Sequence, residues 1–428
     1  MVTAPVKRRR PLQGALCCVS VASLLALAAC AQVPRREAPP SLLTTATPVG
    51  FTADVRLLST DRASVETRST TDLPRLRRVS KDGTVRALVL SGGGAGGAFG
   101  AGALIGLSRR HERPEYQVVT GVSAGALIAP FAFLGPAWDP QLRQAFTSGQ
   151  GGKMSLHGLL SLSFAAARRS ALLKSLVDRY ITADLIKAIA REAASGRILW
   201  VATTDLDKEE TVIWDMGAIA RRGGEPAREL FRDVLVASAS IPGVFEPVLI
   251  RVQEGGVLYD EMHVDGGVSA PLFVAPAAAS FALLDQQGLA GAEVYVLING
   301  RLISAPQTTR FQSGAIVRRS VATAIRSMAR AQAIAVDQFA EKYRMSLRST
   351  YLPFDYPVYN PGDFRAAVMR PLFDYGERCA ESGRLWTTAE ETIANVSTAA
   401  RSLNPTPPTE QETACPARAL GYSTAVGP

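Results

Sequence analysis

The stretch from residue 86 to 103, RALVLSGGGAGGAFGAGA, is the feature that most limits how this chain can fold. An apolar segment of the kind that forms a buried strand leads through a glycine cluster into small and apolar residues at helical spacing. Glycine permits positive φ angles and close approach of the backbone. The first N–H groups of a helix lack intrahelical partners and favour negative charge. The pattern therefore predicts a strand, a glycine turn and a helix whose start binds a phosphate or an oxyanion.

The same alternation of strand and helix continues along the chain. Residues 116–122 form a second short apolar run, and residues 123–134 follow it with small residues at helical spacing. A β-α-β-α order is typical of a parallel sheet covered by helices, so the predicted fold class is α/β with a mostly parallel central sheet. Further strands are expected at 197–203, 210–215, 248–252, 257–264 and 293–298, and helical patterns at 141–192, 227–240, 315–344 and 363–382.

The N-terminus has the pattern of an export signal. Residues 1–29 combine the basic run Lys7 to Arg10 with a short apolar segment, as a signal peptide does. The sequence Leu27-Ala28-Ala29-Cys30 resembles a bacterial lipobox, in which Cys30 becomes the lipidated N-terminus; ordinary secretory cleavage near Ala29 is the alternative. The alanine at position 31, where such lipoproteins can carry Asp, favours the outer membrane. We expect an exported, membrane-anchored lipoprotein that faces the periplasm.

Composition divides the rest of the chain into four parts. Residues 30–80 are rich in Pro, Ser, Thr and Arg and are expected to be a tether. Residues 81–305 are the expected main domain, 306–403 a helical C-terminal extension, and 404–428 a loose tail. The small and apolar residues of 315–344 favour core packing over a membrane surface, with a lid over a pocket as the alternative.

Charge and cysteine content restrict the partners and the compartment. The formal net charge is +9, of which the signal peptide carries four, so +5 remains for the rest. This is far from the dense basic clustering of nucleic-acid binding, and no nucleic-acid partner is expected. After Cys17 and Cys18 leave with the signal and Cys30 serves as the anchor, Cys379 and Cys415 remain and can pair in an oxidising compartment.

The strongest chemical signal is the segment Gly121-Val122-Ser123-Ala124-Gly125, which lies between a predicted strand and a predicted helix. This is the pattern of a nucleophile elbow, a sharp turn that exposes a serine hydroxyl and tolerates only small neighbours. A serine needs a base, and the chain has three histidines: His111 in a charged helix end, His157 in a polar stretch, and His263. His263 lies two residues before Asp265, so the candidate bases converge on one segment.

Four motifs in order resemble the patatin-like phospholipase family over residues 85–300. They are Gly92-Gly93-Gly94 with Gly97, the Ser123 elbow, Ala237-Ser238-Ala239-Ser240-Ile241-Pro242 with Phe245 and Pro247, and Asp265-Gly266-Gly267. The resemblance implies a three-layer α/β sandwich and a Ser–Asp dyad without histidine, at Ser123 and Asp265. It also implies cleavage of phospholipid or lysophospholipid esters through an acyl-serine intermediate, with no metal and no cofactor.

The dyad is chemically sound. A carboxylate within hydrogen-bond reach of the serine hydroxyl can accept its proton if its surroundings raise its basicity. Backbone N–H groups of the glycine run would then hold the oxyanion, and the candidates are Gly92, Gly93, Gly94, Ala95 and Gly97. The chain departs from the family at Gly96, where many members carry Arg or Lys. The non-catalytic alternative makes Asp265 a turn residue that caps its own Gly-Gly bend.

Three other functions compete with this interpretation. The spacing Gly92-x-Gly94-x-x-Gly97 also fits a dinucleotide-binding turn, with Glu112 or Glu115 as the ribose contact. A membrane-anchored binding lipoprotein that kept the fold without activity is the second. A conventional triad with His263 as the base is the third, since residues two apart in a strand share a face. A small ester in place of a lipid remains open as the substrate.

Overall fold

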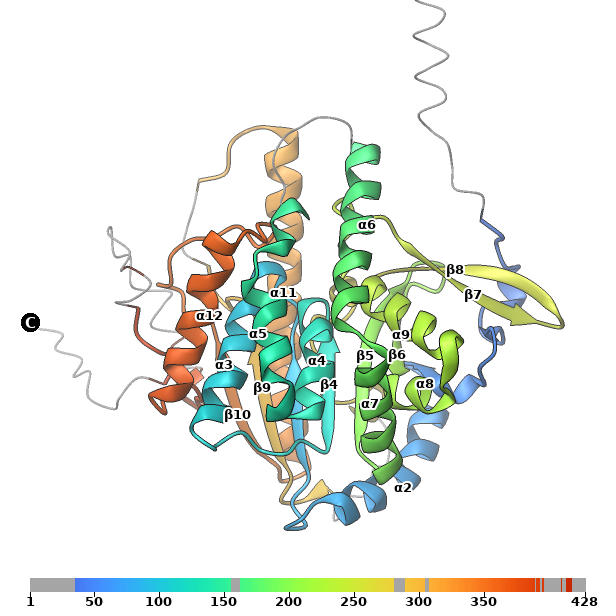
Figure 1. Cartoon of the computed structure of the whole chain (residues 1–428), viewed down its shortest axis with the longest axis horizontal. Helices are drawn as coiled ribbons and strands as arrows, with labels where there is room; N and C mark the ends of the chain where they lie inside the picture. Colours follow the sequence, from blue (N-terminus) through green and yellow to red (C-terminus); the bar gives the residue numbers. More distant parts are fainter. Residues whose placement is uncertain are drawn as a thin grey trace, which may run out of the picture. The chain divides into compact units, whose positions relative to one another are not determined.

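The computed structural model describes residues 35–154, 162–280, 289–304, 308–388, 390–392, 395, 409 and 413–417 (Figure 1). The chain divides into two units, residues 1–37 and residues 38–428, and the fold described below belongs to the second. The predicted signal peptide, Cys30 and His157 lie outside the described residues. In the described part of the chain, no helix is both long enough and apolar enough to cross a bilayer.

Ten strands form one sheet in the described residues. The strands are β1 Thr47–Pro48, β2 Arg56–Leu58, β3 Arg86–Leu90, β4 Val118–Val122, β5 Ile198–Asp205, β6 Glu210–Asp215, β7 Val248–Glu254, β8 Val257–Asp265, β9 Glu293–Ile298 and β10 Ser346–Tyr351. Their order is β1-β7-β8-β5-β4-β3-β9-β10, and β6 joins both β5 and β2.

The centre of this sheet is parallel and one side is antiparallel. Strands β10, β9, β3, β4 and β5 run parallel to one another, whereas β6, β8, β7, β2 and β1 pair antiparallel. The residues of β4 are all buried, as expected for a strand covered on both faces. The α/β class with a parallel centre, predicted from the alternating pattern, is confirmed.

Helices cover both faces of the sheet (Figure 1). They are α2 Arg62–Val79, α3 Gly97–Arg109, α4 Ala124–Leu134, α5 Asp139–Thr147, α6 Leu162–Tyr180, α7 Ala183–Ser195, α8 Met216–Arg222, α9 Gly224–Ser238, α11 Ser313–Lys342 and α12 Ala366–Glu381. On β3, Leu88 and Leu90 point into a core shared with α3, α4 and α12. Val89 points to the opposite face and packs with Val336 of α11. The alternation of a strand thus separates two cores.

The expectation that residues 30–80 form a tether is wrong for residues 47–79. Within this range β1 pairs with β7, β2 pairs with β6, and α2 packs Val65 and Leu76 against the sheet. Asp61 caps α2 through a hydrogen bond from the Ser64 N–H (3.2 Å). The sequence did not indicate these elements, because the two strands have only two and three residues and α2 carries a proline, Pro74, in its interior.

The segment 306–403 is also more than a helical extension. It contains β10, which pairs in parallel with β9 along its whole length and completes the edge of the main sheet. After β10 the chain crosses to the other face, where α12 packs closely on α3. A Cβ atom on Gly102 would lie 2.0 Å from the Phe373 carbonyl oxygen, and one on Gly376 would lie 2.1 Å from that of Phe99. These glycines are required for the two helix backbones to approach.

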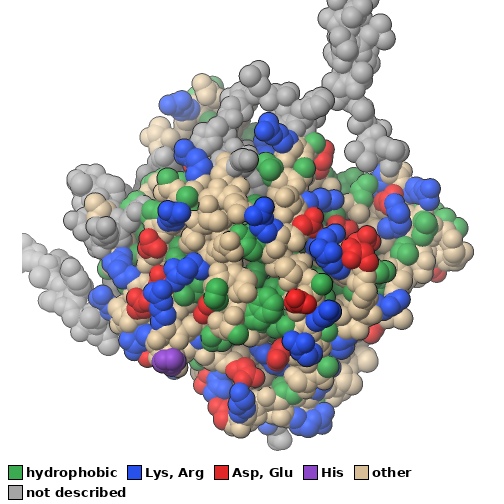
Figure 2. All heavy atoms as spheres, in the orientation of Figure 1, with side chains coloured by type: hydrophobic (Ala, Val, Ile, Leu, Met, Phe, Trp, Pro, Cys, Tyr) green, Lys and Arg blue, Asp and Glu red, His purple; other side chains and the backbone are tan. Residues whose placement is uncertain are grey.

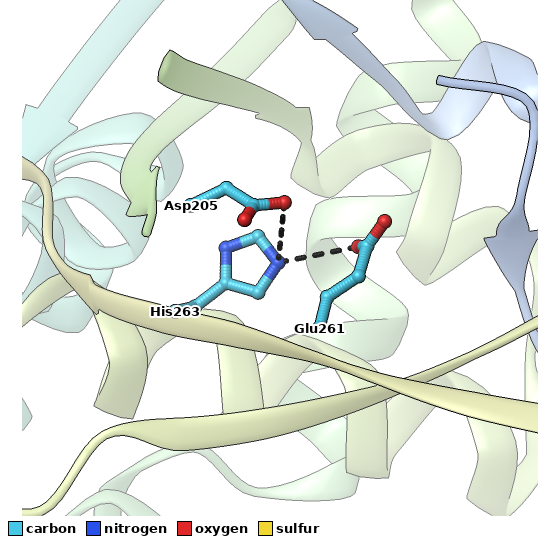
Figure 3. A group of neighbouring side chains, drawn as sticks. All are labelled: Asp205, Glu261 and His263. Carbon is cyan, nitrogen blue, oxygen red and sulfur yellow. Dashed lines mark hydrogen bonds and ion pairs between the residues drawn. The ribbon is translucent and has the colours of Figure 1, made fainter. Parts of the chain in front are cut away.

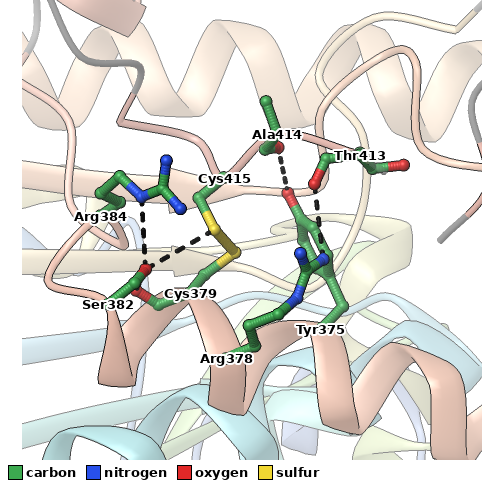
Figure 4. Close-up of a disulfide and its surroundings, with 8 residues drawn as sticks. All are labelled: Tyr375, Arg378, Cys379, Ser382, Arg384, Thr413, Ala414 and Cys415. Atoms are coloured by element: carbon green, nitrogen blue, oxygen red, sulfur yellow. Dashed lines mark hydrogen bonds between the residues drawn. A yellow bond between two sulfur atoms is a disulfide. The ribbon is translucent and has the colours of Figure 1, made fainter. Parts of the chain in front are cut away.

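A disulfide fastens the chain after α12 (Figure 4). Cys379 and Cys415 are bonded, with 5.4 Å between their Cα atoms. Beside them the Tyr375 hydroxyl donates to the Ala414 carbonyl oxygen (2.8 Å). Of the predicted loose tail, the structure describes residue 409 and residues 413–417, and the disulfide holds the latter against α12. This cross-link joins a helix that supports the glycine turn to a segment 36 residues away.

Candidate active site

Ser123 lies in a sharp turn between β4 and α4. Its backbone has φ 55° and ψ −124°, a region that a residue with a side chain rarely occupies. The flanking glycines are required by contact: a Cβ atom on Gly125 would lie 2.3 Å from the Leu90 carbonyl oxygen, and one on Gly121 would lie 2.8 Å from the Cα atom of Ala126. The turn therefore has the strained geometry of a nucleophile elbow.

Asp265, at the end of β8, accepts a hydrogen bond from this serine. The Ser123 Oγ donates to Asp265 Oδ2 over 2.6 Å, and the Gly267 N–H donates to Asp265 Oδ1 over 2.7 Å. Both side chains are buried. A Cβ atom on Gly266 would lie 2.4 Å from the Ala202 carbonyl oxygen, so this glycine lets the Asp265 turn close against β5. The two residues predicted as a dyad, 142 positions apart in the sequence, are thus in direct contact.

Burial raises the pKa of Asp265 to about 7, and the hydrogen bonds from Ser123 and Gly267 oppose this effect only in part. A carboxylate in water near pH 7 is a weak base because its pKa is about 4. A base is most effective when its pKa is close to the working pH. Desolvation therefore gives Asp265 the basicity that a histidine would otherwise supply.

Ser238 holds the backbone of the elbow in place through a hydrogen bond. The Ser123 N–H donates to Ser238 Oγ (2.9 Å), and the Ser238 hydroxyl donates to the Ala202 carbonyl oxygen (2.7 Å). Ser238 is fully buried at the end of α9. The sequence marked this residue as part of a motif, but only the structure assigns it this positioning contact.

The glycine run from Gly92 to Gly97 lies beside the elbow, but its backbone donors are not equivalent. The Gly92 N–H already donates to the Pro271 carbonyl oxygen (3.1 Å), the Ala95 N–H to that of Pro361 (2.8 Å), and the Gly97 N–H to that of Gly94. These three N–H groups are therefore engaged, so the prediction that Gly92, Ala95 and Gly97 donate to the oxyanion is wrong. The N–H groups of Gly93 and Gly94 donate to no acceptor within the described residues, so the candidate oxyanion donors narrow to these two.

The structure gives a reason for the glycine at position 96, at which the sequence departs from the pattern that it resembles. A Cβ atom there would lie 2.1 Å from the Asn299 carbonyl oxygen and 2.6 Å from the Tyr359 hydroxyl oxygen. The segment after β9 and the segment after β10 thus occupy the space into which an Arg or Lys side chain would start. Burial raises the pKa of Tyr359 to about 12, so its hydroxyl is neutral at this position.

Asn299, directly after β9, holds the start of the glycine run. Its Nδ2 donates to the Ser91 carbonyl oxygen (2.7 Å), and its backbone N–H donates to Ser91 Oγ (2.9 Å). A Cβ atom on Gly93 would lie 1.9 Å from the Asn299 carbonyl oxygen. No sequence signal marked this residue, because its partners lie more than 200 positions away.

An apolar pocket opens at Ser123. It encloses about 900 Å³ of empty space, part of it open to solvent, and α4, α5, α6 and the start of α12 supply its walls. Besides Gly94 and Ser123, the walls are mainly aliphatic and aromatic, including Leu127, Phe131, Phe146, Leu176, Ile241 and Phe245. A pocket of this kind suits a hydrocarbon chain and offers little to a charged or strongly polar group.

Neither histidine in the described residues, His111 or His263, forms a hydrogen bond with Ser123. His263 is buried, and its Nδ1 lies 3.0 Å from Thr203 Oγ1. Its Nε2 lies 3.3 Å from Glu261 Oε2 (Figure 3). Because Thr203 Oγ1 accepts the Trp214 Nε1–H (2.8 Å), its own proton is available to Nδ1, and the Nε2–H is directed to Glu261. Both ring nitrogens are therefore engaged. His111 is exposed on a helix end, as expected.

The group Asp205, Glu261 and His263 has the composition of a metal site, but its carboxylates already bind cations. Lys208 Nζ lies 2.5 Å from Asp205 Oδ2 and 2.6 Å from Glu261 Oε1, and Arg56 forms an ion pair with Glu261. Although burial raises the pKa of Glu261, the His263 hydrogen bond and Arg56 hold it below its ordinary value. The cluster is better described as an ion network that joins β2, β5 and β8.

Residues 88–278 match the family model described as patatin-like phospholipase. No curated protein sequence matches the chain. Among solved structures it is similar to VipD from Legionella pneumophila, with 13% identity and a TM-score of 0.33 over 71% of this chain and 69% of that one. It is also similar to human GIVD cytosolic phospholipase A2, with 8% identity and a TM-score of 0.29, covering 64% of this chain and 51% of that one. The same human enzyme in complex with methyl gamma-linolenyl fluorophosphonate gives 10% identity and a TM-score of 0.31, over 82% of this chain and 65% of that one.

Proposed function

We propose that this chain, which carries a patatin-like phospholipase domain at residues 88–278, is a serine acyl hydrolase that cleaves phospholipid or lysophospholipid esters. The observation that carries the proposal is the 2.6 Å hydrogen bond from Ser123, which lines an apolar pocket, to Asp265. A strained elbow, a desolvated carboxylate and two N–H donors that have no acceptor among the described residues then lie side by side. This combination performs acyl transfer and has no use in dinucleotide binding.

The first half of the reaction forms an acyl-enzyme. Ser123 Oγ attacks the ester carbonyl carbon while its proton passes to Asp265 Oδ2, and the carbonyl oxygen becomes an oxyanion held by the N–H groups of Gly93 and Gly94. The tetrahedral species then breaks its bond to the alcohol oxygen. Asp265 returns its proton to that oxygen, the alcohol leaves, and the acyl group remains on Ser123.

The second half repeats the steps with water. Asp265, again ionised, accepts a proton from water as the water oxygen attacks the acyl carbon. The bond to Ser123 Oγ breaks, and the serine takes the proton from Asp265. The products are a carboxylic acid and the restored dyad. In this scheme the chain's own residues supply the nucleophile, the base and the oxyanion donors.

The pocket favours a long acyl chain in the substrate. Its aliphatic and aromatic walls extend from Ser123 toward α6, so a hydrocarbon tail can lie along them while the ester group reaches the serine. About 0.8 kcal/mol is gained for each CH₂ group transferred from water to such surroundings. We expect the free energy of substrate binding to become more favourable with acyl length until the pocket is filled.

The proposal also places the protein at the outer membrane. The N-terminal pattern and Cys30 support export and lipid anchoring, with the domain facing the periplasm from the outer membrane. Several acyl chains on one residue give lasting attachment, whereas one chain gives only marginal binding. Metabolic labelling with a radioactive fatty acid, with and without Cys30→Ser, tests this part separately.

The test of the activity compares three proteins on the same lipids. Wild type, Ser123→Ala and Ser240→Ala are incubated with phosphatidylcholine and lysophosphatidylcholine, and released fatty acids are quantified by mass spectrometry. Ser240 is a matched control because it is also a fully buried serine, it lies just after α9, and its hydroxyl donates to the Val236 carbonyl oxygen and not to the dyad. We expect Ser123→Ala to lose on the order of 10⁴-fold in rate and Ser240→Ala to retain activity.

A fluorophosphonate probe separates the remaining outcomes. It should label wild type and Ser240→Ala covalently and leave Ser123→Ala unlabelled. Equal product release by wild type and Ser123→Ala would exclude the proposed nucleophile. Failure of folded wild type to react with the probe would favour a binding lipoprotein that has kept the fold without the chemistry.

A further inference from the structure

Helix α11, Ser313–Lys342, is attached to the domain by only part of its length. Near its C-terminal end Val336, Phe339 and Ala340 are buried against the sheet and α2. Toward its N-terminal end Val317 is 60% exposed and Val321 is 51% exposed, and Phe311 just before the helix is 98% exposed. The core packing expected for this helix from its small and apolar residues is therefore wrong for its N-terminal half.

The length of α11 places that exposed half on the active-site side. The helix ends beside the start of β10, so it runs from the carboxyl edge of the parallel strands back to their amino edge. Thirty residues of helix span about 45 Å, whereas a six-residue strand spans about 20 Å. The first turns of α11 must then extend beyond the carboxyl edge, where the elbow and the glycine run lie. Figure 1 shows α11 and α6 projecting from the same end of the domain.

The outward face of this half is apolar and uncharged. Residues 317, 321, 324, 328, 331 and 335 recur at intervals of three and four and so lie along one side of the helix. All six are Val, Ala or Met, and all but the half-buried Met328 are exposed. An exposed stripe of this kind on a polar surface marks a contact with another apolar phase.

The opposite side of the helix is basic. Between residues 309 and 336 there is no Asp or Glu, and Arg319, Arg326 and Arg330 recur on the side of the helix opposite the stripe. Arg326 is half-buried and faces Arg319, Arg301 and Arg330; burial and these neighbours lower its pKa. On the face drawn in Figure 2, Lys and Arg side chains also lie near the end at which α6 and α11 project.

The basic side of α11 lies close to a segment that contacts the glycine run. The Arg301 guanidinium lies 5.8 Å from the centre of the Tyr359 ring and donates to the carbonyl oxygens of Tyr356 and Pro357. The Tyr359 hydroxyl in turn lies beside Gly96. The same short segment, 356–361, therefore contacts both the arginine cluster and the glycine run.

We propose that the N-terminal half of α11 is a docking helix for an anionic phospholipid bilayer. Its apolar stripe enters the boundary between headgroups and acyl chains, while arginines of its polar side bind phosphate groups. An amphipathic helix with an apolar face and Arg on the polar face has the physical properties of an interfacial helix. A second copy of the chain is the competing occupant of the stripe, and the last pair of variants below tests it. The contact is independent of any lipid anchor.

The main test places a fluorescent reporter on the stripe. The full chain carries Cys30→Ser, so that lipidation cannot contribute, and Ser123→Ala, so that lipid is not consumed. Val321→Trp is compared with Val257→Trp, a matched valine that is 53% exposed at the start of β8 in the β7–β8 hairpin. Vesicles contain phosphatidylcholine alone or with phosphatidylglycerol, and their acyl chains carry bromine, which quenches nearby tryptophan.

With anionic vesicles, V321W should lose about half of its added emission and shift to shorter wavelength, whereas V257W should match the parent protein. Absence of quenching in V321W, or equal quenching in both variants, would overturn the proposal. Equal quenching of V321W by uncharged vesicles would overturn the role of the arginines. Because no turnover is measured, failure here is distinct from failure of the proposed hydrolase.

A second pair of variants tests the competing occupant. Val317→Asp with Val321→Asp should reduce partition onto anionic vesicles roughly ten-fold or more, and Val257→Asp should leave it unchanged. These side chains are exposed, so far-ultraviolet circular dichroism should show an intact fold. If the double variant instead converts a dimer to a monomer in light scattering and leaves vesicle binding unchanged, a second copy covers the stripe and the proposal is wrong.

Discussion

Replacing Asp265 by Asn should make the protein more stable at high pH while abolishing its activity. In the folded protein burial raises the pKa of Asp265 to about 7, from about 4 in the unfolded chain. Between these values the folded state holds a proton that the unfolded state has released. The free energy of unfolding therefore falls as the pH rises from about 4 to about 7.

The size of the effect follows from that difference. About three pKa units at 1.4 kcal/mol each give on the order of 4 kcal/mol of stability lost above pH 7. Asn cannot ionise and avoids this loss. The Asn amide also fits the site. Its oxygen can accept from the Gly267 N–H, and its NH₂ group can donate to Ser123 Oγ, as the proton of a neutral aspartic acid would.

Chemical denaturation of wild type and Asp265→Asn at pH 5 and pH 8 measures this directly. The two proteins should have similar unfolding free energies at pH 5, and the variant should be more stable at pH 8 by up to about 4 kcal/mol. The rate of ester hydrolysis by wild type should rise through a midpoint near pH 7, because only ionised Asp265 accepts the serine proton. A stability difference that is the same at both pH values would refute the desolvation argument.

Three further substitutions test the parts around the dyad. Ser238→Ala removes the acceptor of the Ser123 N–H, so it should lower kcat with little change in KM and reduce the free energy of unfolding by about 1–3 kcal/mol. Ser240→Ala is the control and should leave kcat unaltered. Steady-state kinetics and chemical denaturation measure these effects. Gly96→Ala should cost about 1–3 kcal/mol because its Cβ atom would meet Asn299 and Tyr359, while Gly300→Ala, which meets nothing within 4 Å, should stay within about 0.5 kcal/mol. A stable Gly96→Ala would show that the segments after β9 and β10 can move aside. His263→Asn should lose stability by about 1–3 kcal/mol but keep turnover within about ten-fold, and a loss near 10³-fold would restore the imidazole as the base.

Much of the candidate site can be predicted from the sequence because its key residues lie in short local patterns. Gly121, Ser123 and Gly125 mark the elbow, since a sharp strand-to-helix turn limits the size of its neighbours within five positions. The Asp265-Gly266-Gly267 turn marks the partner in the same way. The spacing could not show that these segments meet, and the resemblance to a family supplied that expectation.

The sequence was least informative where an element owes its place to distant partners. Strands β1 and β2 are too short to show an alternation of polar and apolar residues. Helix α2 contains Pro74 and is mostly polar, so its sequence does not indicate a helix. Strand β10, SLRSTY, has the polar alternation of an edge strand and becomes one only by pairing with β9. Asn299 is ordinary in its local context and acts through Ser91, more than 200 residues earlier.

Local sequence patterns are enough to predict the main order of strands, glycine turns and helices, the serine elbow and the Asp-Gly-Gly turn, because backbone sterics and hydrophobic periodicity act over a few residues. Four properties depend on the folded chain: which N–H groups have no acceptor in the described residues, why position 96 is glycine, how far burial raises the pKa of Asp265, and which half of α11 is exposed. Each of these depends on atoms brought together from distant parts of the chain. Desolvation, steric fit and exposure are properties of that assembly, and no local pattern of residues contains them.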